Sequence, residues 1–222
     1  MTGLPPGSLA CEVAGSTVVM LPQRALWLPE HETVLVADLH WGKAAAFRAA
    51  HVPVPVGTTA SDLARLSIVL ESTRAQRLVV LGDLLHARSG RHADTLDVIA
   101  GWRAHHAAVH MLLVRGNHDL HAGDPPPELD IACTSTPWRA GSFVGVHEPE
   151  PHTAGYVLAG HWHPHVTMRG RGRTSTRLPA FAFGTSVGIL PAFSSFTGGG
   201  MYEPRPNDDL YVIADDEVLA LA

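Results

Sequence analysis

Short apolar runs recur along the chain, and most of them end directly in a side chain that can bind a metal ion. Each run is four or five residues long, which is typical of a buried strand and too short for a helix. Six runs precede residue 160: Val18–Leu21, Thr33–Ala37, Leu78–Leu81, Met111–Val114, Phe143–Val146 and Tyr156–Ala159. We predict that these runs are strands of a buried sheet.

Segments with helical spacing separate the earlier strands. We predict helices at three of them: Gly42–Ala50, Ala60–Arg74 and Asp94–His106. Thr59 and Asp62 have the spacing of a capping box at the start of the second helix. Strands that alternate with helices in this way favour an α/β fold.

The pattern changes after about residue 140, where the helical spacing ends. Further strands are predicted at Tyr211–Ala214 and Val218–Leu221, so the second half adds a largely antiparallel or mixed sheet. Irregular loops are expected at His121–Glu128 and Gly198–Asp209, which are rich in Gly, Pro and Asp. Neither loop separates two sizeable cores, and we expect a single domain over residues 1–222.

The composition is that of an ordinary globular chain, since 45% of its 222 residues are hydrophobic and 17% are charged. The formal net charge of −5 excludes a global attraction to nucleic acid or anionic membranes, so a polyanionic substrate requires local charge or bound metal. No apolar run approaches the roughly 20 residues that cross a bilayer, and no secretory signal is recognised. Cys11 and Cys133 are expected to be free thiols in a reducing cytoplasm.

The residues that follow five of the predicted strands constrain the function most. Each of these strand ends presents Asp, Asn or His, and in open α/β sheets ligands bind beyond the carboxyl ends of the strands. The candidate metal ligands are Asp38, His40, Asp83, Asn117, His147, His161 and His163. We therefore expect these side chains to gather at one site.

Spacing and chemistry support a metal site. Asp38 and His40 are two residues apart, as are His161 and His163, and alternate residues of an extended strand point to the same side. The donors are oxygen and imidazole nitrogen without thiolate, which suits Mn²⁺, Fe, Zn²⁺, Co²⁺ or Ni²⁺ rather than a cysteine-bound structural zinc. Seven ligands exceed the needs of one ion but suit two divalent ions about 3.5–4 Å apart that share a carboxylate.

Each motif alone has an ordinary structural explanation. Gly-Asp and Gly-Asn after a strand are common turn sequences, and a single His is more often a surface or core residue. The stretch GNHD at 116–119 could be only a turn, in which Gly116 bends the chain. Five such motifs in order favour the metal site over five unrelated turns.

Basic residues near these motifs are candidates for substrate contact: Lys43, Arg48, His86, Arg169, Arg171 and Arg173. Lys43 and Arg48 either face the substrate or form a solvated helix face. His86 follows Asp83 by three residues and either contacts a substrate oxygen or has no such role. The three arginines of MRGRGRTSTR form either a positive patch that binds the substrate or a polar hairpin turn.

The ordered motifs resemble those of the calcineurin-like metallophosphoesterases, from Asp38 to His163. Flanking residues resemble the bacterial ligase-associated DNA damage response endonucleases: DLHWGKAAAFR at 38–48, LGDLLH at 81–86, GHWHPHV at 160–166 and LPAFSSFTGG at 190–199. This resemblance implies a four-layer α/β/β/α sandwich with two mixed sheets and a dinuclear metal centre. It also implies a manganese-dependent phosphodiesterase and DNA endonuclease in DNA repair, associated functionally with an ATP-dependent DNA ligase, a helicase and an exonuclease.

Carried over by position, the resemblance also implies roles for the site residues. The first metal would be held by Asp38, His40 and His163. The second metal would be held by Asn117, His147 and His161, with Asp83 bridging the two ions. His118 would lie over the substrate phosphate, and we expect it to act as a general acid that Asp119 orients.

Two other functions use the same ligands or the same fold. A phosphomonoesterase or nucleotide-pyrophosphate hydrolase would need the same metal-binding residues. A non-catalytic scaffold would keep the fold without catalysis, but here every expected ligand and His118 are present. A phosphodiesterase that acts on DNA is therefore the leading hypothesis.

Overall fold

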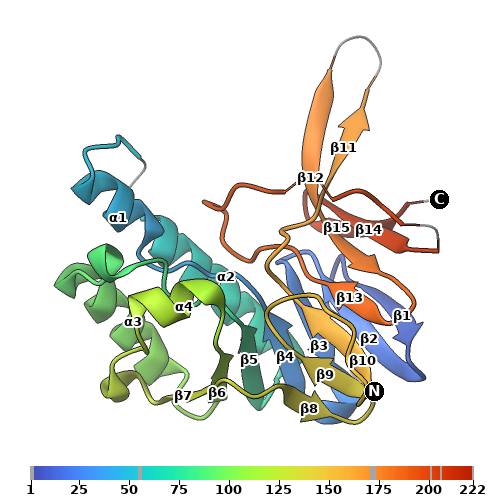
Figure 1. Ribbon diagram of the computed structural model, residues 1–222, viewed down its shortest axis with the longest axis horizontal. Helices are drawn as coiled ribbons and strands as arrows, with labels where there is room; N and C mark the ends of the chain where they lie inside the picture. The colour runs from blue at the N-terminus through green and yellow to red at the C-terminus, as the bar shows by residue number, and fades with distance from the viewer. Residues whose placement is uncertain (1–2, 55–56, 171–173, 201, 206, 222) are drawn as a thin grey trace.

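The computed structural model describes residues 3–54, 57–170, 174–200, 202–205 and 207–221. Its strands form two sheets, and its helices lie together on the outer side of the first one (Figure 1). No helix within these ranges is long and apolar enough to span a membrane. Cys11 and Cys133 are both unpaired.

The first sheet contains seven strands in chain order. They are β1 (Leu9–Val13), β2 (Ser16–Leu21), β3 (Ala25–Leu28), β4 (Thr33–Val36), β5 (Arg77–Leu81), β6 (His110–Val114) and β7 (Ile131–Thr134). The first four strands pair antiparallel, and β4 to β7 pair parallel. Helical segments join β4 to β5 and β5 to β6, as parallel pairing requires.

The second sheet contains eight strands in the order β15-β14-β12-β13-β10-β9-β8 with β11 paired to β12. These are β8 (Trp138–Ala140), β9 (Phe143–Gly145), β10 (Tyr156–Ala159), β11 (His165–Arg169), β12 (Ser175–Phe183), β13 (Val187–Ile189), β14 (Asp209–Ala214) and β15 (Glu217–Ala220). The central strands β9, β10 and β13 pair parallel, and the outer pairs are antiparallel. The expectation of a mixed second sheet is confirmed.

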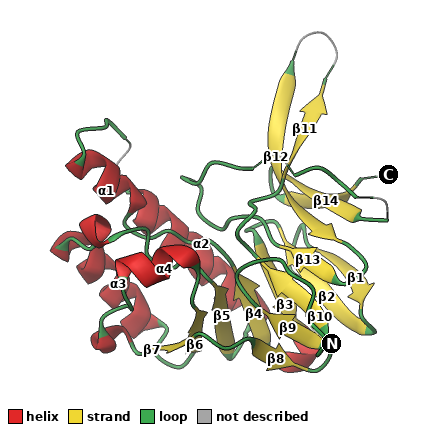
Figure 2. Cartoon of the chain, viewed as in Figure 1, coloured by secondary structure: helices red, strands yellow, loops and turns green. Residues whose placement is uncertain are grey.

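Four α-helices precede Gly123 in the described chain (Figure 2). They are α1 (Lys43–Ala49), α2 (Thr58–Thr73), α3 (Ala93–His105) and α4 (Asn117–Ala122), and short 3₁₀ turns lie at Pro29–His31, Arg88–Gly90 and Pro127–Leu129. The predicted α/β class with two mixed sheets is confirmed. The order of layers in the described chain is helices, first sheet, second sheet, and these ranges contain no α-helix on the far side of the second sheet.

Alternate residues of the central strands enter two different cores. In β5, Leu78 and Val80 pack with Leu66 of α2, whereas Val79 and Leu81 pack against the second sheet. The strands are buried on both faces, which explains why they appear in the sequence as continuous apolar runs. Truncating a fully buried leucine such as Leu66 typically costs about 2–5 kcal/mol of stability.

The strands predicted from apolar runs are all present, with ends that differ by at most two residues. Short or more polar strands were not predicted: β1, β3, β7, β8, β11, β12 and β13. The segment around Asn117 was expected to be a turn, but Asn117–Ala122 is a short helix that also takes in the start of the predicted loop at His121–Glu128.

The capping box expected at Thr59 and Asp62 does not form. Helix α2 begins at Thr58, two residues earlier than predicted, and its N-cap Gly57 has no side-chain hydrogen bond. Thr59 Oγ1 instead accepts a hydrogen bond from the backbone N–H of Gly42, 3.3 Å away. The Asp62 carboxylate pairs with Arg65, which removes it from the helix start.

Candidate metal centre

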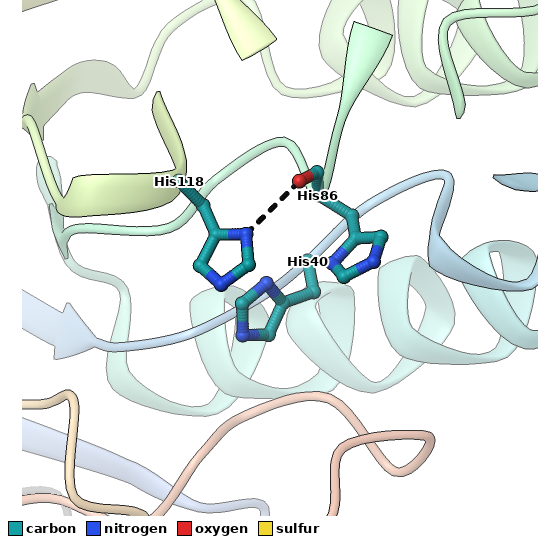
Figure 3. Close-up of side chains that lie close together, drawn as sticks. All are labelled: His40, His86 and His118. Atoms are coloured by element: carbon teal, nitrogen blue, oxygen red, sulfur yellow. Dashed lines mark hydrogen bonds between the residues drawn. The ribbon is translucent and has the colours of Figure 1, made fainter. Parts of the chain in front are cut away.

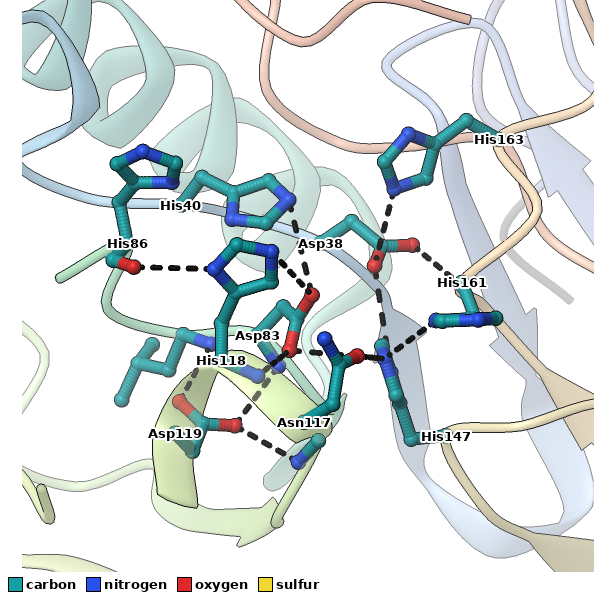
Figure 4. A network of polar contacts seen from close by, with 12 residues as sticks. Asp38, His40, Asp83, His86, Asn117, His118, Asp119, His147, His161 and His163 are labelled. Atoms are coloured by element: carbon teal, nitrogen blue, oxygen red, sulfur yellow. Dashed lines mark hydrogen bonds and ion pairs between the residues drawn. The ribbon is translucent and has the colours of Figure 1, made fainter. Parts of the chain in front are cut away.

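The carboxyl ends of five strands converge on one site between the two sheets. Strands β4, β5 and β6 are parallel and end at the same edge of the first sheet. Strands β9 and β10 are parallel to each other in the second sheet. Figure 4 shows the side chains that meet there, which include every predicted metal ligand: Asp38, His40, Asp83, Asn117, His147, His161 and His163.

Five of these residues have a left-handed backbone. The φ angles are 56° for Asp38, 46° for His40, 55° for Asp83, 69° for His161 and 45° for His163. Asp and His tolerate this region better than most residues, and such conformations concentrate at functional sites. Since β4 ends at Val36 and β10 ends at Ala159, the D-x-H and H-x-H pairs are not on extended strands. The predicted strand alternation is therefore wrong, and sharp turns bring each pair together instead.

The chain after β4 is held along the chain after β5 by backbone hydrogen bonds. The N–H of Asp38 donates to Gly82 O at 3.1 Å, and the N–H of His40 donates to Asp83 O at 2.8 Å. Gly82 lies against the His147 ring, and a side chain at this position would collide with it. The glycine of the GD motif is thus required by close approach as well as by its φ of 81°.

The first group of predicted ligands consists of Asp38, His40 and His163, whose donor atoms lie within 4.8 Å of one another. His163 Nδ1 donates to Gly198 O at 3.0 Å, which leaves the Nε2 lone pair directed at Asp38 Oδ1 at 3.2 Å. Neither atom of this buried pair has a hydrogen-bond partner within the described chain. Two electron-rich atoms at this separation require a cation, because buried polar groups without partners are costly.

A proton can meet this requirement when no metal does. Burial lowers the pKa of His163, but the hydrogen bond that a protonated Nε2 would donate to Asp38 and the negative charge of that carboxylate outweigh burial and leave the pKa raised. A divalent ion bound at the same place would therefore compete with a proton.

The second group consists of Asn117, His147 and His161. His147 Nδ1 donates to Leu81 O at 2.9 Å, so its Nε2 carries a lone pair. That Nε2 lies 3.0 Å from Asn117 Oδ1 and 3.1 Å from His161 Nδ1. The convergence of an amide oxygen and two ring nitrogens again suits a cation.

Asp83 lies between the two groups. Its Oδ1 is 3.5 Å from His147 Nε2, and its Oδ2 is 3.8 Å from His40 Nε2. Burial raises the pKa of Asp83, although the charge that His147 would carry if protonated and the hydrogen bond from the backbone N–H of His118 oppose this. Each oxygen of one carboxylate therefore faces a different group, as a bridging ligand would.

His118 lies beside Asp83 with a defined ring orientation. Its Nδ1 donates to the carbonyl oxygen of His86 at 3.1 Å (Figure 3). This leaves Nε2 4.0 Å from Asp83 Oδ2 (Figure 4). The His118 side chain is 39% exposed, so Nε2 is accessible to a substrate. The rings of His40 and His118 are 4.9 Å apart at their centroids.

Burial lowers the pKa of His40 to about 2 and that of His86 to about 4, and the positive charges of Lys43 and His118 add to the effect. Both rings are therefore neutral near pH 7. A neutral imidazole offers a lone pair to a metal or a hydrogen-bond donor.

The expected contact between Asp119 and the His118 ring is absent. The Asp119 carboxylate accepts hydrogen bonds from four backbone N–H groups instead: Asp83 and Gly116 at 2.8 Å, Leu84 at 3.0 Å and Leu85 at 3.3 Å. Four donors leave no acceptor position for His118, whose Nδ1 is held by His86 O. Asp119 is thus a positioning residue that ties the chain after β5 to the start of α4.

The predicted substrate-binding residues separate into near and distant ones. Lys43 is the first residue of α1 and lies close enough to the centre to interact with its charges. Burial lowers the pKa of the Lys43 ammonium group, and the negative charges of Asp38 and Asp83 offset part of this decrease. The His86 ring is stacked on His118 with centroids 5.2 Å apart. Arg48 instead lines a cavity of about 160 Å³ shared with α2 and α3. Arg169 is exposed on β11, and Arg171 and Arg173 lie outside the described residues.

The loop around Phe193 and Ser194 was not assigned to the site from the sequence, but it packs against the chain that follows β4. The N–H groups of Phe193 and Ser194 donate to Ala37 O and Asp38 O, at 2.7 Å and 3.3 Å. The loop is fastened by buried Asp62, which accepts a 3.3 Å hydrogen bond from the Ser195 N–H and pairs with Arg65 at 2.9 Å. The motif LPAFSSFTGG was a signal for this loop, but nothing in the sequence linked Asp62 to it.

Comparison with solved structures finds a close match. The structure resembles the crystal structure of Pseudomonas putida nuclease MPE with a TM-score of 0.85 and 40% sequence identity, over 96% of this chain and all of that one. The E. coli phosphoesterase Yfce aligns at 18% identity with a TM-score of 0.39, over 86% of this chain and 92% of that one, and supports no further argument. No model of a known protein family matches the sequence, and no curated protein matches it.

Proposed function

This chain belongs to the metallophosphoesterase family of the Pseudomonas putida nuclease MPE, and on that premise we propose that it is a phosphodiesterase that cleaves DNA internally. It is a metal-dependent hydrolase of ester bonds. The observation that carries the proposal is the pair of ligand groups that share Asp83, with the accessible His118 ring beside them. This arrangement would bring a metal-binding surface and a proton donor within reach of one phosphate.

We propose two divalent ions, with Mn²⁺ as the native metal and Fe, Zn²⁺, Co²⁺ or Ni²⁺ as alternatives. Asp38, His40 and His163 would hold one ion and Asn117, His147 and His161 the other, with Asp83 shared. When bound, two such ions supply a hydroxide near neutral pH and stabilise the charge of the reacting phosphate. The unpaired buried atoms Asp38 Oδ1 and His163 Nε2 support this assignment.

His118 has the geometry of a general acid. Because Nδ1 donates to His86 O, the protonated ring presents its Nε2 proton toward Asp83 and the open site. A phosphodiester has a poor leaving alkoxide, and a proton delivered to that oxygen accelerates its departure by roughly 10²–10⁴-fold. The sugar hydroxyl of the product keeps this proton.

Two further residues near the centre have proposed roles, one toward the phosphate and one toward the His118 ring. Lys43 brings a cation next to Asp38 and Asp83, where it offsets negative charge of the substrate. The His86 ring lies on the far side of the His118 ring and fixes it by stacking, while its carbonyl oxygen fixes the tautomer. We therefore assign His86 a positioning role through His118.

A panel of three substrates tests this function. Purified protein with Mn²⁺ is incubated with bis-p-nitrophenyl phosphate, p-nitrophenyl phosphate and circular DNA. Cleavage of the diester and of the DNA supports the proposal, and preferential cleavage of the monoester would instead indicate a phosphomonoesterase. If no substrate is hydrolysed at saturating Mn²⁺, the enzymatic hypotheses are excluded and the non-catalytic scaffold is favoured.

His118→Ala tests the proton donor within the same panel. Metal content should be unchanged, while DNA cleavage should fall by roughly 10²–10⁴-fold and cleavage of the activated p-nitrophenyl diester should fall less. His105→Ala, at an exposed position of α3, is the matched control. Equal losses on both substrates would contradict a general acid.

The wider role remains part of the proposal. The sequence motifs alone support a function in DNA repair and an association with an ATP-dependent DNA ligase, a helicase and an exonuclease. We propose a cytoplasmic location because Cys11 and Cys133 are unpaired. Loss of the gene should then sensitise cells to DNA-damaging agents, and co-purification would identify physical partners.

A further inference from the structure

A long hairpin leaves the second sheet next to the metal centre. Strand β11 pairs only with β12 in the described chain, and the first half of β12 extends beyond the strands that pair with its second half. The hairpin consequently projects from the body of the protein as an arm (Figure 1). It begins at His165, two residues after the predicted metal ligand His163.

The arm belongs to a segment of unusual charge. The sequence contains no Asp or Glu between Glu150 and Glu203, although the chain carries 21 acidic residues and a net charge of −5. The described basic residues of the arm are Arg169 and Arg177, and both are exposed. This charge separation creates a local positive surface on an otherwise acidic protein.

Both arginines lie on the same face of the arm. The register pairs Thr167 with Arg177 and Arg169 with Ser175. Directly paired residues share a face, and so do residues two apart along a strand, so Thr167, Arg169 and Arg177 point to one side. His165 lies on this side as well, by the same spacing.

That face is the one turned to the metal centre. Arg177 Nη2 donates to Gly199 O at 2.9 Å, and the adjacent Gly198 O accepts the hydrogen bond of His163 Nδ1. Arg177 is therefore connected to a predicted metal ligand through two neighbouring residues of one loop. The side chain of Arg169 lies farther out on the same face and has no hydrogen bond or ion pair to any described residue.

We propose that this face of the β11–β12 arm binds the phosphodiester backbone of a DNA strand on its way from the metal centre. From His165 to Arg169 the strand spans about 13 Å at about 3.3 Å per residue. Arginine suits this task because its planar guanidinium bonds phosphate oxygens in pairs.

The inference rests on the proposed function, because it assumes a DNA substrate. The test compares kcat/KM for a labelled DNA strand and for bis-p-nitrophenyl phosphate, with Mn²⁺ and at 50 to 200 mM KCl. Arg169→Ala should lower kcat/KM for DNA several-fold and reduce the salt slope by about one, because one phosphate contact is lost. The small diester cannot reach the arm, so its turnover should not change.

Arg177→Ala should act in the same direction on DNA, and the Arg169→Ala/Arg177→Ala double variant should lose more than either single one. Arg139→Ala is the matched control, because Arg139 is an exposed arginine on β8 at the edge of the same sheet. If kcat/KM for DNA and its salt dependence were unchanged in Arg169→Ala, the proposal that the arm binds DNA would be wrong. An equal loss on both substrates would also overturn it, since the change would then act on the centre itself. Failure of the wild-type protein to cleave either substrate would count against the proposed function instead.

Discussion

The two sheets contribute to the metal centre in different ways. The predicted ligands from the first sheet include Asp38, His40 and Asp83, which are 0%, 3% and 2% exposed. Backbone hydrogen bonds between the segments after β4 and β5 fix these residues, and the Asp119 carboxylate accepts further hydrogen bonds from the segment after β5. His163, from the second sheet, has a side chain that is 17% exposed and is oriented by one loop carbonyl. The first sheet and the buried His147 of the second sheet, which is 4% exposed, thus provide a fixed base, and His163 completes it from a more accessible side.

Removing the shared carboxylate should have the largest effect. Asp83→Asn weakens both ligand groups at once, and metal stabilisation of a reacting phosphate is worth several kcal/mol. We expect kcat for the diester to fall by about 10³-fold or more. His163→Ala affects one group only and should lose less. A His163→Ala loss as large as that of Asp83→Asn would contradict the asymmetry between the two sheets.

Breaking the support beneath the first sheet should mainly reduce stability. Asp119→Ala leaves four backbone N–H groups of the β5 and β6 ends without their acceptor. Each unsatisfied buried group costs about 1–3 kcal/mol, less where water enters, so we expect a loss of about 3 kcal/mol. Urea unfolding of the metal-free protein measures this loss. Asp97→Ala, at an exposed position of α3, should be near neutral. A stable Asp119→Ala protein would refute the positioning role.

Loosening the loop that Asp62 fastens should have a smaller effect. Asp62→Asn removes the charge that holds Arg65 and weakens the hydrogen bonds to Ser195. Groups behind the ligands typically contribute 10–100-fold to metal affinity, and we expect about tenfold here. Isothermal titration with Mn²⁺ measures the affinity. Glu71→Gln, on the exposed face of the same helix, serves as the control. Equal affinities in the two variants would show that the loop does not support the centre.

The stability of the metal-free protein should also depend on pH. The folded pKa of His86 is lowered to about 4, so between pH 4 and 6.5 the unfolded chain binds more protons and stability rises with pH. His40, with its pKa of about 2, acts in the same direction.

The pKa of His163 is raised, so the protonated ring stabilises the folded protein, and this stabilisation is lost as the pH increases above 6.5. Stability should therefore pass through a maximum near pH 6.5, with slopes of at most about 1.4 kcal/mol per pH unit and group. His163→Gln should remove the decrease above pH 6.5 and keep the decrease below it. A profile that still decreases above pH 6.5 in this variant would contradict the assignment.

The central part of the fold could be predicted because its strands are buried on both faces. Runs such as Leu78–Leu81 and Tyr156–Ala159 carry an apolar pattern that requires no tertiary information. Strands such as β8 and β13 could not be predicted, because each has three residues and is stabilised by pairing with neighbours distant in sequence. The capping box failed because Asp62 has a stronger partner in Arg65, which a local pattern does not reveal.

By itself, the sequence determined which residues could bind metal, since donor chemistry and the order of motifs are local properties. Only the tertiary structure decided how these residues meet. It placed Asp38 and His40 by left-handed turns rather than by strand alternation, and it assigned the orientation of His118 to a carbonyl of His86 rather than to Asp119. The reason is that hydrogen bonds between chain segments about 35 residues apart, such as those that Asp119 accepts, depend on how the strands pack and not on neighbouring sequence.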